Sequence, residues 1–248
     1  DSIFEASIST PLLNLGGSMI RNINLSTTVN HNKLDMKFGW DNKQTPINKG
    51  SIKALVDFNQ SSADSSVAKI IFKKSEFIIN DSIWTISPSS VNIDSANIAI
   101  NLFNISNQNQ SLSLTGNISN IPTDSIQVNL DNIDVSNLNF YLKSMGYELG
   151  GRINGFARIN NIYSNPTLIA DLGINKFIVN KRPIGNVKFN TEWFNAEKRL
   201  YINLNNYKND TLTFETKGNL FTETNKLDFK ININSILLSH FSPILEGV

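Results

Sequence analysis

Hydrophobic and polar residues alternate along most of this 248-residue chain. Residues 226–234 read Lys-Leu-Asp-Phe-Lys-Ile-Asn-Ile-Asn, and the same period of two recurs at 34–40, 52–58, 98–102, 126–130 and 200–204. Because successive side chains of a strand point to opposite faces, this period indicates strands with one apolar and one wet face. We expect about fourteen such strands, and therefore an all-β chain.

The amino-acid composition also favours strands, and it argues against several classes of function. Isoleucine, which favours strands, and asparagine, a poor residue in helix interiors, are both abundant. The 22 basic and 21 acidic residues give a net charge of +1, which argues against nucleic-acid binding. The chain has no cysteine, so a disulfide framework and thiolate metal ligands are excluded. No apolar run approaches the ~20 residues that span a bilayer, and no signal peptide opens the sequence.

Two segments break the period of two. Asp134–Met145 places Val135, Leu138, Leu142 and Met145 three or four residues apart, with Gly146 as a stop signal, which predicts a short amphipathic helix. Ser235–Leu245 has a similar spacing, limited by Pro243. No long polar linker occurs, so we expect 1–248 to form one continuous β segment of a longer protein.

The sequence repeats itself at about 102 residues. Asn97–Leu102 matches Arg199–Leu204, and Thr115–Ile118 matches Lys217–Leu220 in the same register. The strand at 126–130 then matches 229–233. A repeat of several strands predicts an array of stacked units, approximately 1–66, 67–147 and 148–248, although two independent sandwich domains of similar pattern remain an alternative.

The last of these units contains a recognisable order of motifs. A glycine-rich strand at Leu149–Asn160 precedes an Asn165-Pro166 turn, and a second strand leads to a Pro183-Ile-Gly185 turn and a strand with Trp193. This order resembles the repeats of the TamB/AsmA-like family (the translocation and assembly module family), most closely the type found in Bacteroidota. The resemblance covers most of 67–248, whereas 1–66 match only in strand pattern.

The resemblance implies an elongated, curled antiparallel sheet that forms an open hydrophobic groove. It also implies a non-enzymatic protein of the Gram-negative periplasm, anchored in the inner membrane through a segment that this sequence lacks. Family members are implicated in phospholipid transport between the two membranes, in outer membrane biogenesis and in work with an outer-membrane β-barrel assembly partner. The expected partners are therefore phospholipid acyl chains, the rest of the same chain at both ends and such a β-barrel protein, with no nucleic acid and no cofactor.

The residues suit a groove of this kind. An alternating sheet must cover its apolar face, either with a second layer as ordinary core or, in a curled array, with a bound hydrocarbon. Following the family, we expect the groove to be lined by Ile98, Ile100, Leu102, Leu112, Leu114, Ile126, Val128, Leu130, Leu200, Ile202, Leu204, Leu227, Phe229, Ile231 and Ile233.

Other functions receive less support from the sequence. His31 and His240 lack the acidic neighbours of a metal site, and Gly150–Gly155 lacks the helix and the lysine of a phosphate loop, so we interpret its glycines as a strand bulge. The basic steps Lys73-Lys74 and Lys181-Arg182 are typical of solvated turns. An extracellular adhesion or carbohydrate-binding module, with a closed core, remains the alternative. A β-solenoid polysaccharide-processing enzyme, with parallel coils, is a third interpretation.

Overall fold

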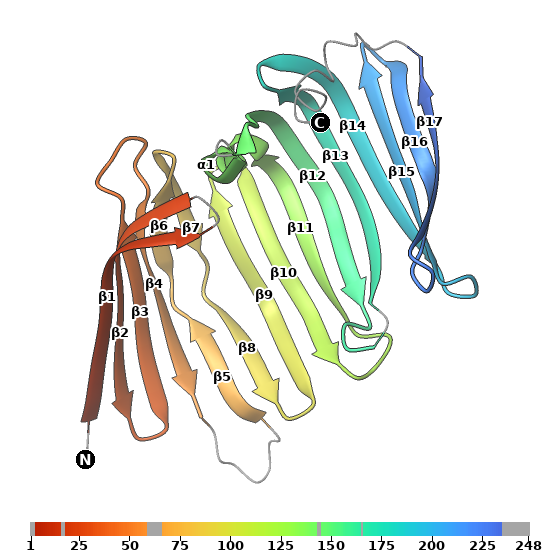
Figure 1. Cartoon of the computed structure of the whole chain (residues 1–248). Helices are drawn as coiled ribbons and strands as arrows, with labels where there is room; N and C mark the ends of the chain where they lie inside the picture. Colours follow the sequence, from red (N-terminus) through yellow and green to blue (C-terminus); the bar gives the residue numbers. More distant parts are fainter. Residues whose placement is uncertain (1–2, 16–17, 59–65, 143–144, 165, 235–248) are drawn as a thin grey trace. The chain divides into compact units, whose positions relative to one another are not determined.

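The computed structural model describes residues 3–15, 18–58, 66–142, 145–164 and 166–234. Nearly all of them lie in one antiparallel sheet of 17 strands (Figure 1). The expectation of an all-β fold is therefore confirmed. No helix within the described ranges is long and apolar enough to cross a membrane.

The chain divides into two compact units. Unit 1 contains residues 1–128 and 161–164, and unit 2 contains 129–160 and 165–248. The division falls inside strand β11 (Ser125–Asp134), away from the expected repeat boundaries at 66/67 and 147/148. The 102-residue repeat thus stays a prediction, although the strands at its two ends follow one another in the same order.

Unit 1 begins as a meander in which β1 to β4 each pair with the next strand. The strands are β1 (Ile3–Leu15), β2 (Ser18–Asn30), β3 (Lys33–Asp41), β4 (Lys49–Asp57), β5 (Ser66–Phe72), β6 (Ser75–Ile79), β7 (Ser82–Ile86), β8 (Ser89–Asp94), β9 (Asn97–Asn107) and β10 (Gln110–Ser119). Strand β4 pairs with β5 along one half and with β6 along the other, and β9 pairs in the same way with β8 and β7. Therefore β5–β6 and β7–β8 act as two long, interrupted strands.

Local features mark the two interruptions, between β5 and β6 and between β7 and β8. The buried hydroxyl of Ser75 accepts a hydrogen bond from the backbone N–H of Lys53 at 3.0 Å and donates to the carbonyl of Lys73 at 2.9 Å. Between β7 and β8 the chain passes through Pro88, which has no backbone N–H to offer a ladder. At the break between β5 and β6, the hydroxyl of Ser75 therefore replaces a backbone acceptor, and the N–H of Lys53 on β4 keeps a hydrogen bond.

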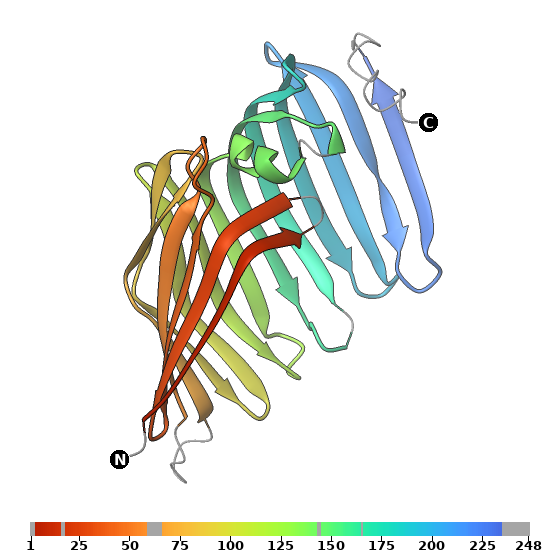
Figure 2. The same ribbon diagram turned by 60° about the vertical axis from the view of Figure 1, so that its left-hand side comes forward.

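Unit 2 continues the meander after β11. Its strands are β12 (Leu149–Asn160), β13 (Thr167–Val179), β14 (Arg182–Phe194), β15 (Arg199–Lys208), β16 (Thr211–Phe221) and β17 (Lys226–Ile233). Each pairs with the next, and in both views β13–β17 lie side by side in a single layer (Figures 1 and 2). The β13–β14 turn has positive φ at Asn180 (48°) and Lys181 (65°), the backbone of a two-residue type I′ hairpin.

The expected helix at 134–145 is present but short. It consists of a 3₁₀ turn, η1 (Val135–Leu138), followed by one α-helical turn, α1 (Asn139–Leu142). Asp134 is the N-cap, and its carboxylate accepts from the N–H of Ser136 at 2.9 Å. Val135 is buried. The second expected helix, Ser235–Leu245, lies outside the described residues.

Candidate functional site

The strands of unit 2 present one continuous apolar face. Thr191 of β14 pairs with Ile202 of β15, Ile202 pairs with Gly218 of β16, and Gly218 pairs with Phe229 of β17. Directly opposed residues project to the same side of a sheet. Extending this register places three polar residues, Thr191, Asn206 and Thr216, on the same side. The other side chains there are apolar and are called the unit 2 apolar face: Ile153, Ala157, Ile159, Leu168, Ala170, Leu172, Ile174, Val187, Phe189, Trp193, Leu200, Ile202, Leu204, Phe214, Leu220, Leu227, Phe229, Ile231 and Ile233.

The opposite face of the same strands is polar. Asn190, Asn203 and Lys217 form one of its cross-strand rows, and Lys188 lies over the ring of Tyr207 with 5.6 Å between the ammonium and the ring centroid. The guanidinium of Arg199 donates to the amide oxygen of Asn219 at 2.6 Å. The two faces therefore differ in chemistry as the alternation requires.

The unit 2 apolar face is not sealed by protein among the described residues. Of its members only Ala170 is buried, at 3% exposure. Leu227, Ile231 and Ile233 on β17 are 66%, 59% and 56% exposed, and the members on β15 are half-buried between their strand neighbours. A sandwich core would hide these side chains almost completely. The face therefore resembles a single-layer surface rather than a closed core.

Gly218 lets β17 lie flat against β16. A Cβ built on Gly218 would lie 2.1 Å from the carbonyl oxygen of Asp228 and 2.8 Å from Cδ1 of Phe229. The Phe229 ring therefore covers the position that a side chain would occupy, and it fills the gap in the apolar surface. Such covering of a glycine by a cross-strand aromatic ring is a known means of stabilising sheets.

The seven residues that the sequence places in the groove from β15 and β17 all lie on this face. They are Leu200, Ile202, Leu204, Leu227, Phe229, Ile231 and Ile233. Sequence reasoning missed the contributions of β12–β14, such as Val187 and Phe189. Their alternation with Lys188, Asn190 and Glu192 is visible in the sequence and would have found them.

Unit 1 has its own apolar surface on β9 and β10. Four expected residues share it, because Ile98 and Ile100 pair with Ile118 and Gly116, while Leu112 and Leu114 pair with Ile105 and Phe103. Leu102 does not, which corrects the expected pattern. The register shifts between Leu114 and Gly116, so β9 carries an extra residue there, and Leu102 is 59% exposed with a φ of 37°.

Strand β11 carries the remaining expected residues. Ile126, Val128 and Leu130 alternate along it and are half-buried. The first two belong to unit 1 and Leu130 belongs to unit 2. The expected set is therefore distributed over two units, and each part is considered separately.

Part of the unit 1 apolar surface is closed by aromatic packing. The ring centroids of Phe38 and Trp40 are 5.8 Å apart, and those of Trp40 and Phe77 are 5.9 Å apart. Phe77 and Trp84 are buried, and Ile86 is only 1% exposed. These residues form a small core where β4 meets β6 and β7, and they are less available to a ligand than the unit 2 apolar face.

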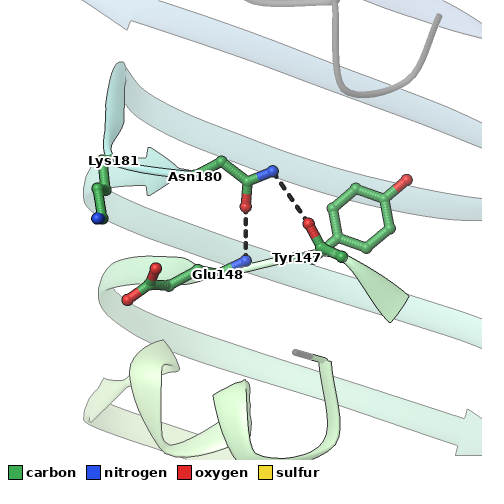
Figure 3. Close-up of a pocket in the computed structure, with 5 residues that line it drawn as sticks. Tyr147, Glu148, Asn180 and Lys181 are labelled. Carbon is green, nitrogen blue, oxygen red and sulfur yellow. Dashed lines mark hydrogen bonds between the residues drawn. The ribbon is translucent and has the colours of Figure 1, made fainter. Parts of the chain in front are cut away.

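A shallow depression of about 250 Å³ lies beside the β13–β14 turn and is lined by Gly146, Tyr147, Glu148, Asn180 and Lys181 (Figure 3). The Asn180 amide oxygen accepts from the N–H of Glu148 at 2.7 Å, and its NH₂ group donates to the carbonyl of Gly146 at 3.1 Å. Because the amide both accepts and donates a hydrogen bond, we interpret Asn180 as a structural link between the β13–β14 turn and the segment before β12.

The other candidates take structural roles. His31 lies in a turn beside the amide oxygen of Asn30, His240 is outside the described residues, and no cluster of metal-ligating side chains occurs among those described. Gly150 and Gly151 lie at a register shift between Gly150 and Arg152, as the bulge interpretation predicts, whereas Gly155 pairs in regular register with Leu172. Lys73 forms an ion pair with Asp35.

One carboxylate has a shifted ionisation. The hydrogen bond from Asn232 and then that from Lys217, at 2.8 Å and 3.1 Å, lower the pKa of Glu215 below its ordinary value. Glu215 lies on the polar face of β16, and its partner Asn232 lies opposite on β17. The carboxylate therefore joins the last two strands and has no reactive partner of its own.

Comparisons with known proteins add no family. No family model matches the chain, and no curated protein or solved structure matches it.

Proposed function

We propose that the unit 2 apolar face binds phospholipid acyl chains, as part of a non-enzymatic conduit for lipid between the inner and outer membranes. One observation carries this proposal: a six-strand sheet presents an apolar face that no second layer covers among the described residues. Exposed apolar patches of such extent are typical of binding surfaces. The antiparallel pairing also contrasts with the parallel coils that a solenoid enzyme would need.

The size and energetics of the face suit a hydrocarbon. Five spacings of ~4.8 Å separate β12 from β17, so the face extends about 24 Å across the strands. Each methylene removed from water contributes about 0.8 kcal/mol, so a sixteen-carbon chain gains roughly 12 kcal/mol relative to water. Leaving a bilayer costs about the same amount. The exchange is therefore nearly neutral, which favours transfer over permanent storage.

The acyl-chain proposal is tested with Ile202→Asp, which places a charge at the centre of the unit 2 apolar face. The matched control is Asn203→Asp, which puts the same carboxylate on the polar face of the same strand. Native mass spectrometry and binding of a fluorescent phospholipid should show loss of lipid for Ile202→Asp and retention for the control. Circular dichroism checks that both variants keep their strands. Equal lipid binding by the two folded variants would contradict the proposal.

The cellular setting is part of the same proposal. It rests on the resemblance of the repeat to the TamB/AsmA-like family, which works in the periplasm. Fractionation of a Gram-negative host is expected to place the full-length protein with the envelope, and crosslinking there should recover an outer-membrane β-barrel protein. Recovery in the cytoplasm would contradict this setting and leave the acyl-chain test unaffected.

A further inference from the structure

Two lysines lie directly opposite each other on inner strands of unit 1. Lys37 of β3 pairs with Lys53 of β4, and both side chains are exposed. The N–H of Asn42 donates to the carbonyl of Asn48 at 3.0 Å, so the even-numbered residues of β3 form the hydrogen-bonded pairs with β4. Lys37 and Lys53, called the lysine pair, are therefore a non-hydrogen-bonded pair, in which the Cα atoms approach to about 4.5 Å. Like charges so placed destabilise a sheet.

No carboxylate of the described residues neutralises the lysine pair. Neither ammonium group forms an ion pair or a hydrogen bond within the described ranges. The acidic side chains nearby each have another lysine as partner: Asp35 pairs with Lys73, Asp57 with Lys33 at 4.0 Å and Glu76 with Lys74 at 3.9 Å. The positive charge of the lysine pair is therefore available to an anion from outside the described structure.

A second pair of opposed lysines shows what the first one lacks. Lys217 of β16 lies directly opposite Lys230 of β17. There the ammonium of Lys217 lies 3.1 Å from the carboxylate of Glu215 on the same strand. The chain thus supplies an anion where these two lysines meet, and it supplies none for Lys37 and Lys53.

The surface beside the lysine pair is hollow. Five residues line a depression of about 360 Å³ there: Ser51, Lys53, Lys74, Ser75 and Glu76. The cross-strand row next to the lysine pair consists of Gly39 and Ser51, whose small size leaves this space open. The hydroxyl of Ser51 has no hydrogen-bond partner among the described residues. The depression therefore combines an unpaired cationic row with a free hydroxyl group.

We infer that the lysine pair binds a phosphate monoester over the row of Gly39 and Ser51. A phosphate monoester carries nearly two negative charges at neutral pH, which match the two ammonium groups. Its three terminal oxygens accept hydrogen bonds, and the two ammonium groups and the Ser51 hydroxyl can donate them. The monoester belongs either to a small soluble molecule or to the headgroup of a lipid. The inference does not rest on the acyl-chain proposal, because it concerns other strands and their polar face.

Calorimetric titration of the whole chain with glycerol 3-phosphate tests the site. Lys37→Gln and Lys53→Gln should each weaken binding by about tenfold or more, because each removes a charge-assisted hydrogen bond. Lys33→Gln removes the same charge from the same face of β3 and should bind like the wild type. No binding by the wild type, or an equal loss in Lys33→Gln, would overturn the inference.

Thermal unfolding gives a second measurement with inorganic phosphate as the probe. At constant ionic strength, exchanging chloride for phosphate should raise the Tm of the wild type and of Lys33→Gln more than that of Lys53→Gln, because a ligand stabilises the state that binds it. An equal rise in all three proteins would show that phosphate acts only by exclusion from the surface, and the site would be refuted.

Vesicles distinguish the two sources of the monoester. Phosphatidylcholine vesicles with and without phosphatidic acid, whose headgroup is a phosphate monoester, are sedimented with the wild type and with Lys53→Gln. Cosedimentation that requires both phosphatidic acid and Lys53 assigns the site to a lipid headgroup. Binding of glycerol 3-phosphate without cosedimentation assigns it to a soluble phosphate. Cosedimentation that is unchanged in Lys53→Gln, together with unchanged titration of that variant, would overturn the inference.

Discussion

Ile86 and Ile83 lie three residues apart on β7 and differ mainly in burial. Ile86 is 1% exposed and packs on the side of Trp84 and Phe77, whereas Ile83 is 62% exposed. Replacing either by alanine removes the same atoms and the same β-branched preference for strands. The difference between the two variants therefore isolates the contribution of the small unit 1 core.

The expected difference is large. Truncating a fully buried isoleucine to alanine costs about 2–5 kcal/mol, because apolar contacts are lost and a cavity is left. A surface substitution usually changes stability by less than about 0.5 kcal/mol, and the lost strand preference of up to about 1 kcal/mol is common to both variants and cancels in the comparison. Ile86→Ala should therefore be at least about 1.5 kcal/mol less stable than Ile83→Ala.

Urea unfolding followed by tryptophan fluorescence measures this difference, since Trp40 and Trp84 both lie in unit 1. With a slope of about 2 kcal/mol per molar urea, the two midpoints should differ by roughly 0.7 M or more, with equal slopes. If the two variants unfold within about 0.2 M of each other, Ile86 does not lie in a packed core, and the distinction between a closed part of unit 1 and an open face in unit 2 is refuted.

Three further predictions concern unit 2 and one glycine of unit 1. Gly218→Ala should cost about 1–3 kcal/mol, because its Cβ would lie 2.1 Å from a β17 carbonyl, whereas Gly39→Ala, with its nearest atom at 3.5 Å, should be tolerated; thermal unfolding compares them. The hydrogen bond from Asn232 lowers the pKa of Glu215, so the ionised carboxylate stabilises the fold above the ordinary carboxyl pKa of 4.5, and this stabilisation is lost as the pH falls through the lowered pKa. Glu215→Gln should therefore lower the stability at neutral pH and have little effect at strongly acidic pH. Unfolding measured at several pH values checks this sign. Asp134→Ala should cost about 1 kcal/mol through loss of the helix cap, with unchanged strand content by circular dichroism.

The period of two predicts the fold well because it is a local signal. Leu227, Phe229 and Ile231 alternate in the sequence, and the structure places them on one face of β17. The change of period likewise predicted the short helix within Asp134–Met145, and the structure has helical turns over Val135–Leu138 and Asn139–Leu142. In both cases the information lies within a few consecutive residues.

The failures arise where the structure depends on partners distant in sequence. Leu102 continues an unbroken alternation with Ile98 and Ile100, and only the register against β10 reveals the extra residue that turns it away. The split of one long strand into β5 and β6 likewise depends on the hydroxyl of Ser75 meeting Lys53, 22 residues earlier. A single sequence carries no direct record of such pairings.

A single-layer sheet such as unit 2 must draw its stability from neighbouring strands rather than from a deep core. Each inner strand is held on two sides, and its half-buried side chains contact the rows before and after it, so stability approaches a sum of nearest-neighbour terms. Strand β17 has one described neighbour and the most exposed members of the unit 2 apolar face, so we expect it to open at a lower free energy than the inner strands. A hydrocarbon on the apolar face would add contacts to these exposed side chains. Because a ligand stabilises the state to which it binds, a bound acyl chain should protect β17 from opening.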